Sequence, residues 1–180
     1  MTVRKTVKPK QKTISLIEME LAISKMFGIR QHIIVPNISW GFLSHEADLC
    51  VITKSGCLKE IEIKRSFSDF KADFKKGHTH GDRQNRITEF YYAFPIELLE
   101  KCLPLVPEGA GIITCHKDVN KTWKPYARIE RKAKRIKGSR SLNTVEQLSI
   151  ARLGCLRIWS GKDKIVTLQN KLDGSTKVQK

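Results

Sequence analysis

Two short apolar stretches joined by a glycine-containing turn constrain the fold of this 180-residue chain most strongly. Residues 47–53 and 58–64 each have the length and β-branched content of a strand, and only residues 54–57 lie between them. Such a pair predicts an antiparallel hairpin. Since a slip of one residue moves every side chain to the other face, the loop length decides which side chains meet.

The hairpin carries charge where apolar side chains would be expected. A two-residue loop would place Asp48 opposite Ile63, on the wrong side for contact with Glu62. A three-residue loop with Gly56 near the left-handed conformation, or a bulge of one residue, would instead pair Asp48 with Glu62 or Lys64. We expect this second arrangement, which brings Asp48, Glu62 and Lys64 together on one face.

The segment before the hairpin, residues 14–27, has helical periodicity. Its apolar face consists of Leu16, Met19, Ile23, Met26 and Phe27. Glu18 and Lys25 lie on the opposite side, toward water, but Glu20 falls inside the apolar arc. Because a buried carboxylate is costly unless it is paired or bound to a metal, Glu20 becomes a fourth candidate for the charged group.

The remaining segments predict an α/β (α+β) fold, a small mixed β-sheet flanked by helices. The expected elements are a β-prone stretch over 32–42, a helix from Ser66 or Ser68 to about residue 76, strands over 88–95 and 109–115 with a short helix between them, and a final helix over 143–159. Asn143 and Glu146 form a capping signal for that helix. Its expected packing stripe is Val145, Leu148, Ala151, Cys155 and Trp159. We expect a flexible basic arm over 1–12, one domain over 13–165 and a polar tail over 166–180.

A strong excess of positive charge indicates a polyanionic partner. The chain has 34 Lys and Arg against 18 Asp and Glu, a net charge of +16. The segment 121–140 is the most basic, and a solvated face is the alternative to nucleic-acid contact there. Its candidate phosphate ligands are Lys121, Lys124, Arg128, Arg131, Lys132, Lys134, Arg135 and Lys137.

Membrane and disulfide chemistry are not expected. No apolar run approaches the ~20 residues that span a bilayer, and residues 1–12 lack the apolar core of a signal peptide. We therefore expect a cytoplasmic protein, with its oligomeric state left open. Five cysteines without a C-x-x-C pair predict reduced, mostly buried thiols.

Two carboxylates about 5 Å apart repel each other unless a cation lies between them. Lys64 alone could fill this role within a surface charge ladder. The sharper interpretation is Mg²⁺ or Mn²⁺, because such ions prefer oxygen ligands and bind through one or two carboxylates plus substrate phosphate and water. A metal there would lower the pKa of a bound water and offset phosphodiester charge, with Lys64 orienting or activating that water.

Asp48 followed by Glu62-Ile63-Lys64 resembles the PD-(D/E)XK nuclease superfamily, which has the restriction-endonuclease-like fold. The flanking text "EIKRSFSDFKADFKK" and "FYYAFP" is similar to the bacterial and phage branch related to MmcB-type DNA repair proteins, and this resemblance covers most of residues 14–160. Ala47 stands where the superfamily usually has proline.

The resemblance implies roles for each residue of the motif. Asp48 and Glu62 would be metal ligands and the backbone carbonyl of Ile63 a further ligand. Lys64 would be the catalytic lysine, and Glu20 the helix acid that reaches the metal directly or through water. We therefore expect a Mg²⁺- or Mn²⁺-dependent deoxyribonuclease active in DNA repair, recombination or phage DNA processing. The alternative is an inactive accessory protein of the same fold that binds DNA or RNA.

Other polar residues near the motif have open roles. Glu46 and Glu60 are candidates for a supporting role or a second metal, although solvated positions are expected for both. For His45, His78 and His80 we favour contact with phosphate or water, or no function, over zinc. Asp69 and Asp73 share one helical face; the resemblance includes them, and pairing with Lys75, Lys76 or the helix N-terminus is the alternative.

Overall fold

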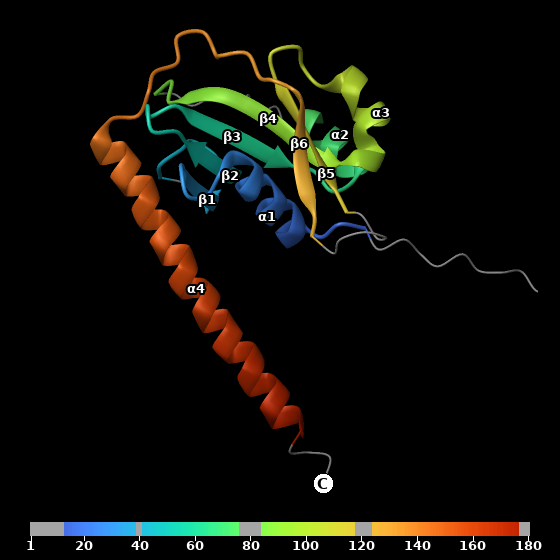
Figure 1. Ribbon diagram of the computed structural model, residues 1–180, viewed down its shortest axis with the longest axis vertical. Helices are drawn as coiled ribbons and strands as arrows, with labels where there is room; N and C mark the ends of the chain where they lie inside the picture. Colours follow the sequence, from blue (N-terminus) through green and yellow to red (C-terminus); the bar gives the residue numbers. More distant parts are fainter. Residues whose placement is uncertain (1–12, 39–40, 76–83, 118–123, 177–180) are drawn as a thin grey trace, which may run out of the picture.

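Six strands form one mixed sheet in the order β1-β2-β3-β4-β5-β6 (Figure 1). The strands are β1 (Ile33–Ile38), β2 (Ala47–Ile52), β3 (Leu58–Ile63), β4 (Ile87–Pro95), β5 (Gly111–His116) and β6 (Tyr126–Arg131). This computed structural model describes residues 13–38, 41–75, 84–117 and 124–176. The expected basic arm, residues 1–12, lies outside the described residues.

The connections explain why the sheet is mixed. Short loops join β1 to β2 and β2 to β3, and these pairs are antiparallel. The parallel pairs β3/β4 and β4/β5 have helical crossovers, as parallel neighbours require. The first crossover contains α2 (Phe67–Lys75). The second contains η1 (Ile96–Leu98), α3 (Leu99–Cys102) and η2 (Leu103–Leu105). The predicted α/β class with a mixed sheet is confirmed.

Helices cover both faces of this sheet, which separates its core into layers. On one face, α1 (Leu16–Phe27) packs with Met19 and Ile23 against Leu49 and Ile61. The other face has two apolar clusters, one under the start of α4 (Thr144–Thr176) and one under α2 and α3. Strand alternation turns the β3 acids toward this second face, between the two clusters.

The predicted helix starts are confirmed where the structure describes their caps. The Ser66 hydroxyl accepts a hydrogen bond from the Asp69 N–H at 3.1 Å. Asn143 and Glu146 form a reciprocal capping pair, with both backbone N–H groups donating to the partner side chain at 2.9 Å. In α1 the expected apolar face needs one correction, because Leu16 is exposed. All five cysteines are free, and three of them are buried.

The strand β6 was missed by the sequence analysis, which saw only a basic run there. Its polar side chains alternate with Ala127 and Ile129, which pack against the α1 side of the core. β6 pairs with β5 alone, so it is an edge strand of the sheet. Charged side chains on an edge strand protect the strand from pairing with other chains. These charges made the sequence of β6 look like a solvated basic segment, so the strand was not predicted.

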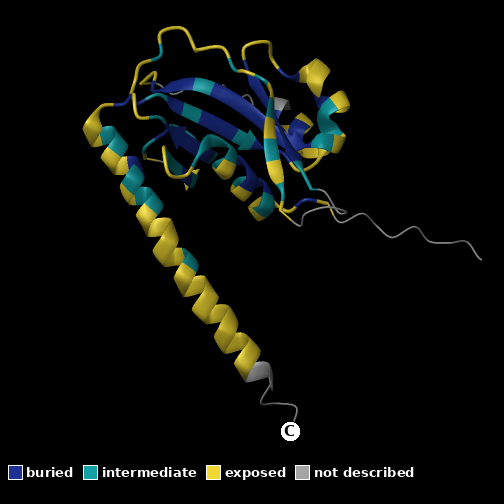
Figure 2. Ribbon diagram, viewed as in Figure 1, coloured by how far each residue is buried: buried dark blue, intermediate teal, exposed yellow. Residues whose placement is uncertain are grey.

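The last helix differs from the prediction in length and in packing face. α4 continues past the expected end at residue 159 to Thr176, through the predicted domain boundary at residue 165. The predicted stripe is wrong, because Val145, Leu148 and Trp159 are exposed, whereas Ile150 is buried (Figure 2). Among the described helices, none combines the length and hydropathy that a membrane span requires.

Candidate functional site

The register of the β2–β3 hairpin brings the predicted acids together. Leu49 lies opposite Ile61 and Cys50 opposite Glu60, which sets Asp48 opposite Glu62. The loop has three residues, closed by a hydrogen bond of 3.0 Å from the Thr53 N–H to the Cys57 carbonyl. The predicted three-residue loop is therefore confirmed.

Gly56 makes this loop possible for two reasons. Its φ of 79° is in the left-handed region that glycine adopts without strain. A Cβ at this position would also lie 2.6 Å from the backbone carbonyl oxygen of Leu142. The same residue thus sets the hairpin register and lets the segment before α4 pass close to the loop.

Lys64 is buried at the centre of the charged group. Its ammonium donates hydrogen bonds to Glu62 Oε1 at 2.6 Å and to Asp73 Oδ1 at 2.8 Å. The Tyr92 hydroxyl donates to the other oxygen of Asp73 at 3.0 Å. Burial alone would lower the pKa of Lys64, but the hydrogen bonds to Asp73 and Glu62 raise it above its usual value. The lysine is therefore a fixed cation at neutral pH.

The acids of the group disfavour one another's ionisation. Burial, and then the charge of Asp48, raise the pKa of Glu62 despite its hydrogen bond to Lys64. Burial also raises the pKa of Asp48, although its carboxylate accepts a hydrogen bond of 2.8 Å from the Ile63 N–H. The same two causes, burial and the charge of Asp48, raise the pKa of Glu20. Glu20 is therefore half-buried on α1 and close enough to Asp48 for the two charges to interact. Helix α1 covers the face of the sheet opposite to Glu60 and Glu62, so a place for Glu20 beside these two acids stays a prediction.

Two neighbouring acids have positions that the sequence analysis left open. Glu60 is fully buried, so the solvated position expected for it is wrong, and His45 Nε2 lies 2.7 Å from its Oε1. Asp73 accepts a hydrogen bond from Lys64, and the side chains of Lys75 and Lys76, its other expected partners, lie outside the described residues. Glu46 and Asp69 are exposed. His78 and His80 lie outside the described residues.

Two of the acids, Asp48 and Glu62, could serve as carboxylate ligands of a divalent metal ion. Within the described parts of the chain, no cluster of three or more His, Cys, Asp or Glu side chains is arranged to hold a metal ion. Asp48 and Glu62 are two facing carboxylates at the end of the hairpin, and burial is the main reason that the pKa values of both are raised. Mg²⁺ is commonly held by one or two carboxylates, with water and substrate phosphate as the remaining ligands. The donor set fits such an ion.

A small cavity adjoins Asp48 and adds a cation to the site. It has a volume of about 130 Å³, and its lining includes Asn37, Glu46, Asp48 and Arg157. Arg157 reaches this cavity from α4 and donates a hydrogen bond to the Asn37 carbonyl. The sequence analysis missed Arg157, since only the docking of α4 on β1 brings it near Asp48.

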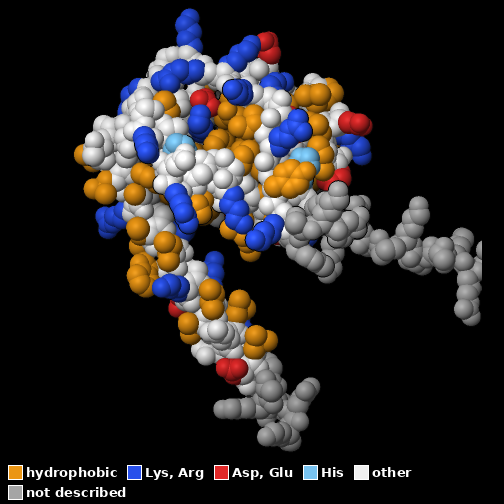
Figure 3. Space-filling view, viewed as in Figure 1, with side chains coloured by type: hydrophobic (Ala, Val, Ile, Leu, Met, Phe, Trp, Pro, Cys, Tyr) orange, Lys and Arg blue, Asp and Glu red, His pale blue; other side chains and the backbone are white. Residues whose placement is uncertain are grey.

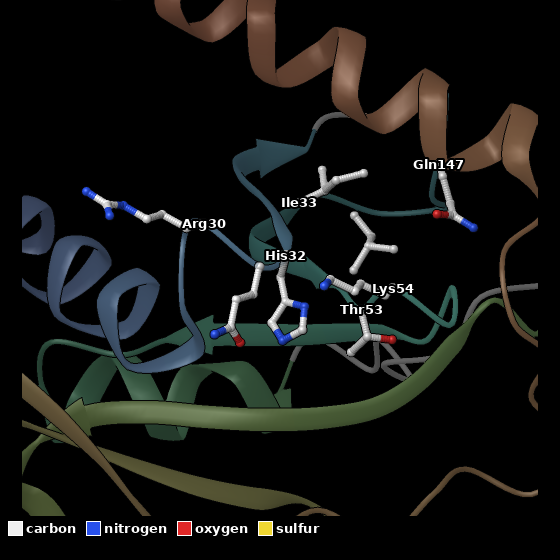
Figure 4. A pocket seen from close by; sticks show the side chains of 8 residues that line it. Arg30, His32, Ile33, Thr53, Lys54 and Gln147 are labelled. Carbon is white, nitrogen blue, oxygen red and sulfur yellow. The ribbon is translucent and has the colours of Figure 1, made fainter.

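A larger pocket lies at the opposite end of the hairpin. It has a volume of about 370 Å³ and is lined by residues that include Arg30, His32, Lys54 and Gln147 (Figure 4). These residues come from the segment between α1 and β1, the β2–β3 loop and the start of α4. The pocket is therefore separate from the acidic group at the other end of β2.

The basic segment contributes fewer available cations than its composition suggested. Arg131 is tied to the fold, because its guanidinium donates to the carbonyls of Ala110, Val106 and Pro107. Lys134 forms an ion pair with Glu108.

The other candidates in this segment differ in exposure and pairing. Arg128 lies 3.6 Å from Glu130, while Lys124, Lys132 and Lys137 are exposed to solvent. Arg135 is exposed and donates to the Cys57 thiol. Lys121 lies outside the described residues.

Comparisons with known proteins support the fold without a function. No protein-family model matches the chain, and no curated protein matches it significantly. A solved structure, described as the SPO1766 protein of unknown function from Silicibacter pomeroyi, has a similar fold with a TM-score of 0.53. The match has 17% sequence identity and covers 91% of this chain and 95% of that one.

Proposed function

We propose that this protein is a Mg²⁺- or Mn²⁺-dependent deoxyribonuclease with a restriction-endonuclease-like core. The observation that carries the proposal is the hairpin register, which sets Asp48 opposite Glu62 beside the buried Lys64. Lys64 already has two acidic partners, Glu62 and Asp73, so the structural ion pairs of this lysine are complete without further acids. Here two more carboxylates, Asp48 and Glu20, are placed where burial and mutual repulsion raise their pKa values.

Each residue has a definite part in the proposed reaction. Asp48 and Glu62 would hold the metal, with the Ile63 carbonyl and Glu20 as the further ligands that the superfamily resemblance implies. The metal would supply a water of lowered pKa and offset the charge on the phosphodiester. Lys64, held by Glu62 and Asp73, remains protonated, so it would orient the attacking water and offset phosphate charge rather than act as a base.

The surroundings of the acids suit a phosphate-bearing substrate. Arg157 lines the same cavity as Asp48, so a phosphate there would lie close to a guanidinium. The net charge of +16 draws polyanions to the protein over longer distances. DNA repair, recombination and phage DNA processing are the settings that this activity would serve.

The test is cleavage of plasmid DNA by the pure protein with Mg²⁺ or Mn²⁺, compared with EDTA. We expect metal-dependent cleavage, and we expect Asp48→Asn, Glu62→Gln and Lys64→Met each to slow it by at least about a hundredfold. Glu46→Gln is the matched control, because Glu46 lines the cavity beside Asp48 but is exposed. Equal cleavage by all variants would mean that the site is wrong.

A DNA-binding protein without cleavage is the second candidate. It is favoured by the pairing of Glu62 with Lys64 and by the lack of a three-ligand cluster in the described regions. It predicts DNA binding that persists in Asp48→Asn and no cleavage with either metal.

A further inference from the structure

Helix α4 consists of a docked half and an overhanging half. In the docked half, Ile150 is buried in the core and Gly154 lies against β1. A Cβ on Gly154 would come within 3.1 Å of a Val35 methyl group. In the overhanging half, from Ile158 to Asp173, every residue except Gly161 is exposed, and the helix extends away from the sheet (Figures 1 and 2). The overhang therefore lacks the tertiary packing that stabilises most protein helices.

The overhanging half carries a regular apolar row. Alternating spacings of three and four residues connect Ala151, Gly154, Ile158, Gly161, Ile165, Leu168 and Leu172. This seven-residue repeat is typical of a helix that packs against another helix. Ile158, Ile165, Leu168 and Leu172 are each between 56% and 68% exposed. Figure 3 shows hydrophobic side chains along this part of the helix, interleaved with Lys and Arg.

Among the described residues of the row, Ile158, Ile165 and Leu168 each keep more than half of their surface exposed. A Cβ on Gly161 would meet no atom of the described structure within 4 Å, so the docked domain does not approach the helix at that level. Contiguous exposed apolar surface of this kind marks an interaction site. The row begins on the docked half of α4 and keeps the same spacing along the overhanging half. A partner helix bound to the overhanging half would therefore contact the same face of α4 that packs against the sheet in the docked half.

The charges beside the row decide what kind of partner fits. Arg157, Lys164 and Lys171 precede its residues, and Lys162 and Gln169 follow them. The positions that precede Ile158, Ile165 and Leu172, together with those that follow Gly161 and Leu168, therefore contain four cations and no acid, since Asp163 and Asp173 lie outside them. A parallel pair of two such helices would place Arg157 near Lys162 of the other copy, and an antiparallel pair would also oppose cation to cation. Self-association is disfavoured in both orientations.

We propose that the overhanging half of α4, from Ile158 to Leu172, is a docking helix for another protein. The partner is a helix with an apolar heptad row flanked by Asp or Glu. A lipid surface fits less well, because Lys162 and Gln169 separate the row from Trp159 and Val166 and interrupt a broad apolar face. This inference does not depend on the proposed nuclease activity.

The test measures binding of the full-length protein to synthetic helices of about three heptads, with Ile and Leu in the row and either Glu or Lys at the flanks. Fluorescence anisotropy should show that the Glu peptide binds at least about tenfold tighter than the Lys peptide. Ile158→Ser should weaken that binding by about tenfold. Leu156→Ser is the matched control, because Leu156 is 52% exposed on the opposite side of the helix, and it should change nothing.

A charge-reversal variant tests the same proposal without altering the apolar row. Lys164→Glu combined with Lys171→Glu should bring the preference toward the Lys peptide, while circular dichroism shows the helix retained. Several results would overturn the proposal. These are equal binding of both peptides, binding of neither, a wild-type dimer in sedimentation that Ile158→Ser dissociates, or binding to phosphatidylglycerol vesicles without any preference between peptides.

Discussion

Two charged regions of the molecule can be compared: the acidic group on the β2–β3 hairpin and the basic segment over 121–140. In the acidic group the charged side chains contact one another, whereas in the basic segment several of them are separate. Lys64 is 3% exposed and is held by two carboxylates, so each member fixes the protonation of the others. In the basic segment Lys124, Lys132 and Lys137 are exposed. Removing a charge from the acidic group should therefore change the free energy of unfolding and the catalytic activity. Removing charges from the basic segment should lower DNA affinity by separate, additive amounts.

The largest expected effect follows from removing the buried cation. Lys64→Met leaves Glu62 and Asp73 buried without their partner, and we expect the free energy of unfolding to fall by about 3–5 kcal/mol. Lys59→Met is the control on the same strand. Its ion pair with Glu89 is partly exposed, so the loss there should be below about 1 kcal/mol. Urea denaturation of both variants measures the difference, and similar losses would contradict the buried network.

The basic segment should respond additively. Replacing Lys124, Lys132 and Lys137 by Gln should lower DNA affinity and reduce the log–log salt slope of binding by about 0.9 for each phosphate that the variant no longer neutralises. Stability should stay unchanged. Arg131→Gln is the contrasting variant, because its guanidinium holds three backbone carbonyls and its removal should lower stability instead. If the triple variant has an unchanged salt slope, these three lysines do not contact DNA phosphates.

The smallest effect concerns the pH dependence of stability. The pKa of Asp48 is raised, so the folded state holds a proton that the unfolded chain releases, and stability falls as pH rises through the ordinary carboxyl range. Without divalent metal, Asp48→Asn should therefore raise the free energy of unfolding at neutral pH by about 0.5–2 kcal/mol. The same substitution should also reduce the decrease in stability that occurs as pH rises through the ordinary carboxyl range.

A second acid provides a control of opposite sign. The Arg140 side chain lowers the pKa of Glu146 to about 2, so its contribution is present above the ordinary carboxyl range and is lost as pH falls toward 2. Glu146→Gln should therefore weaken the protein at neutral pH. Urea unfolding across the acid range measures both variants. A neutral-pH loss of stability in Asp48→Asn would contradict the repulsion among the site acids.

The parts of the site that depend on local geometry could be predicted from the sequence. Loop length and Gly56 define the hairpin register, so the meeting of Asp48 and Glu62 follows from short-range rules. Helical periodicity likewise predicts the partial burial of Glu20. Asp73 and Tyr92 complete the Lys64 network from other elements, and nothing in their local sequence identifies them as its partners.

The parts that depend on docking could not be predicted. α4 contains more than one apolar stripe, and the face that packs includes Gly154, where a Cβ would come within 3.1 Å of a Val35 methyl group. This choice buries Ile150 in place of the expected stripe and brings Arg157 to the cavity beside Asp48. Such packing depends on shape complementarity between distant segments, which hydrophobic periodicity does not encode.

The most direct test of the central claim is anomalous X-ray scattering from a crystal of the wild-type protein soaked with Mn²⁺. The account predicts an anomalous peak between the carboxylates of Asp48 and Glu62, at about 2 Å from their oxygens. The peak should be lost in Asp48→Asn and kept in Glu46→Gln. A soaked wild-type crystal that shows no peak between these two acids would contradict the account.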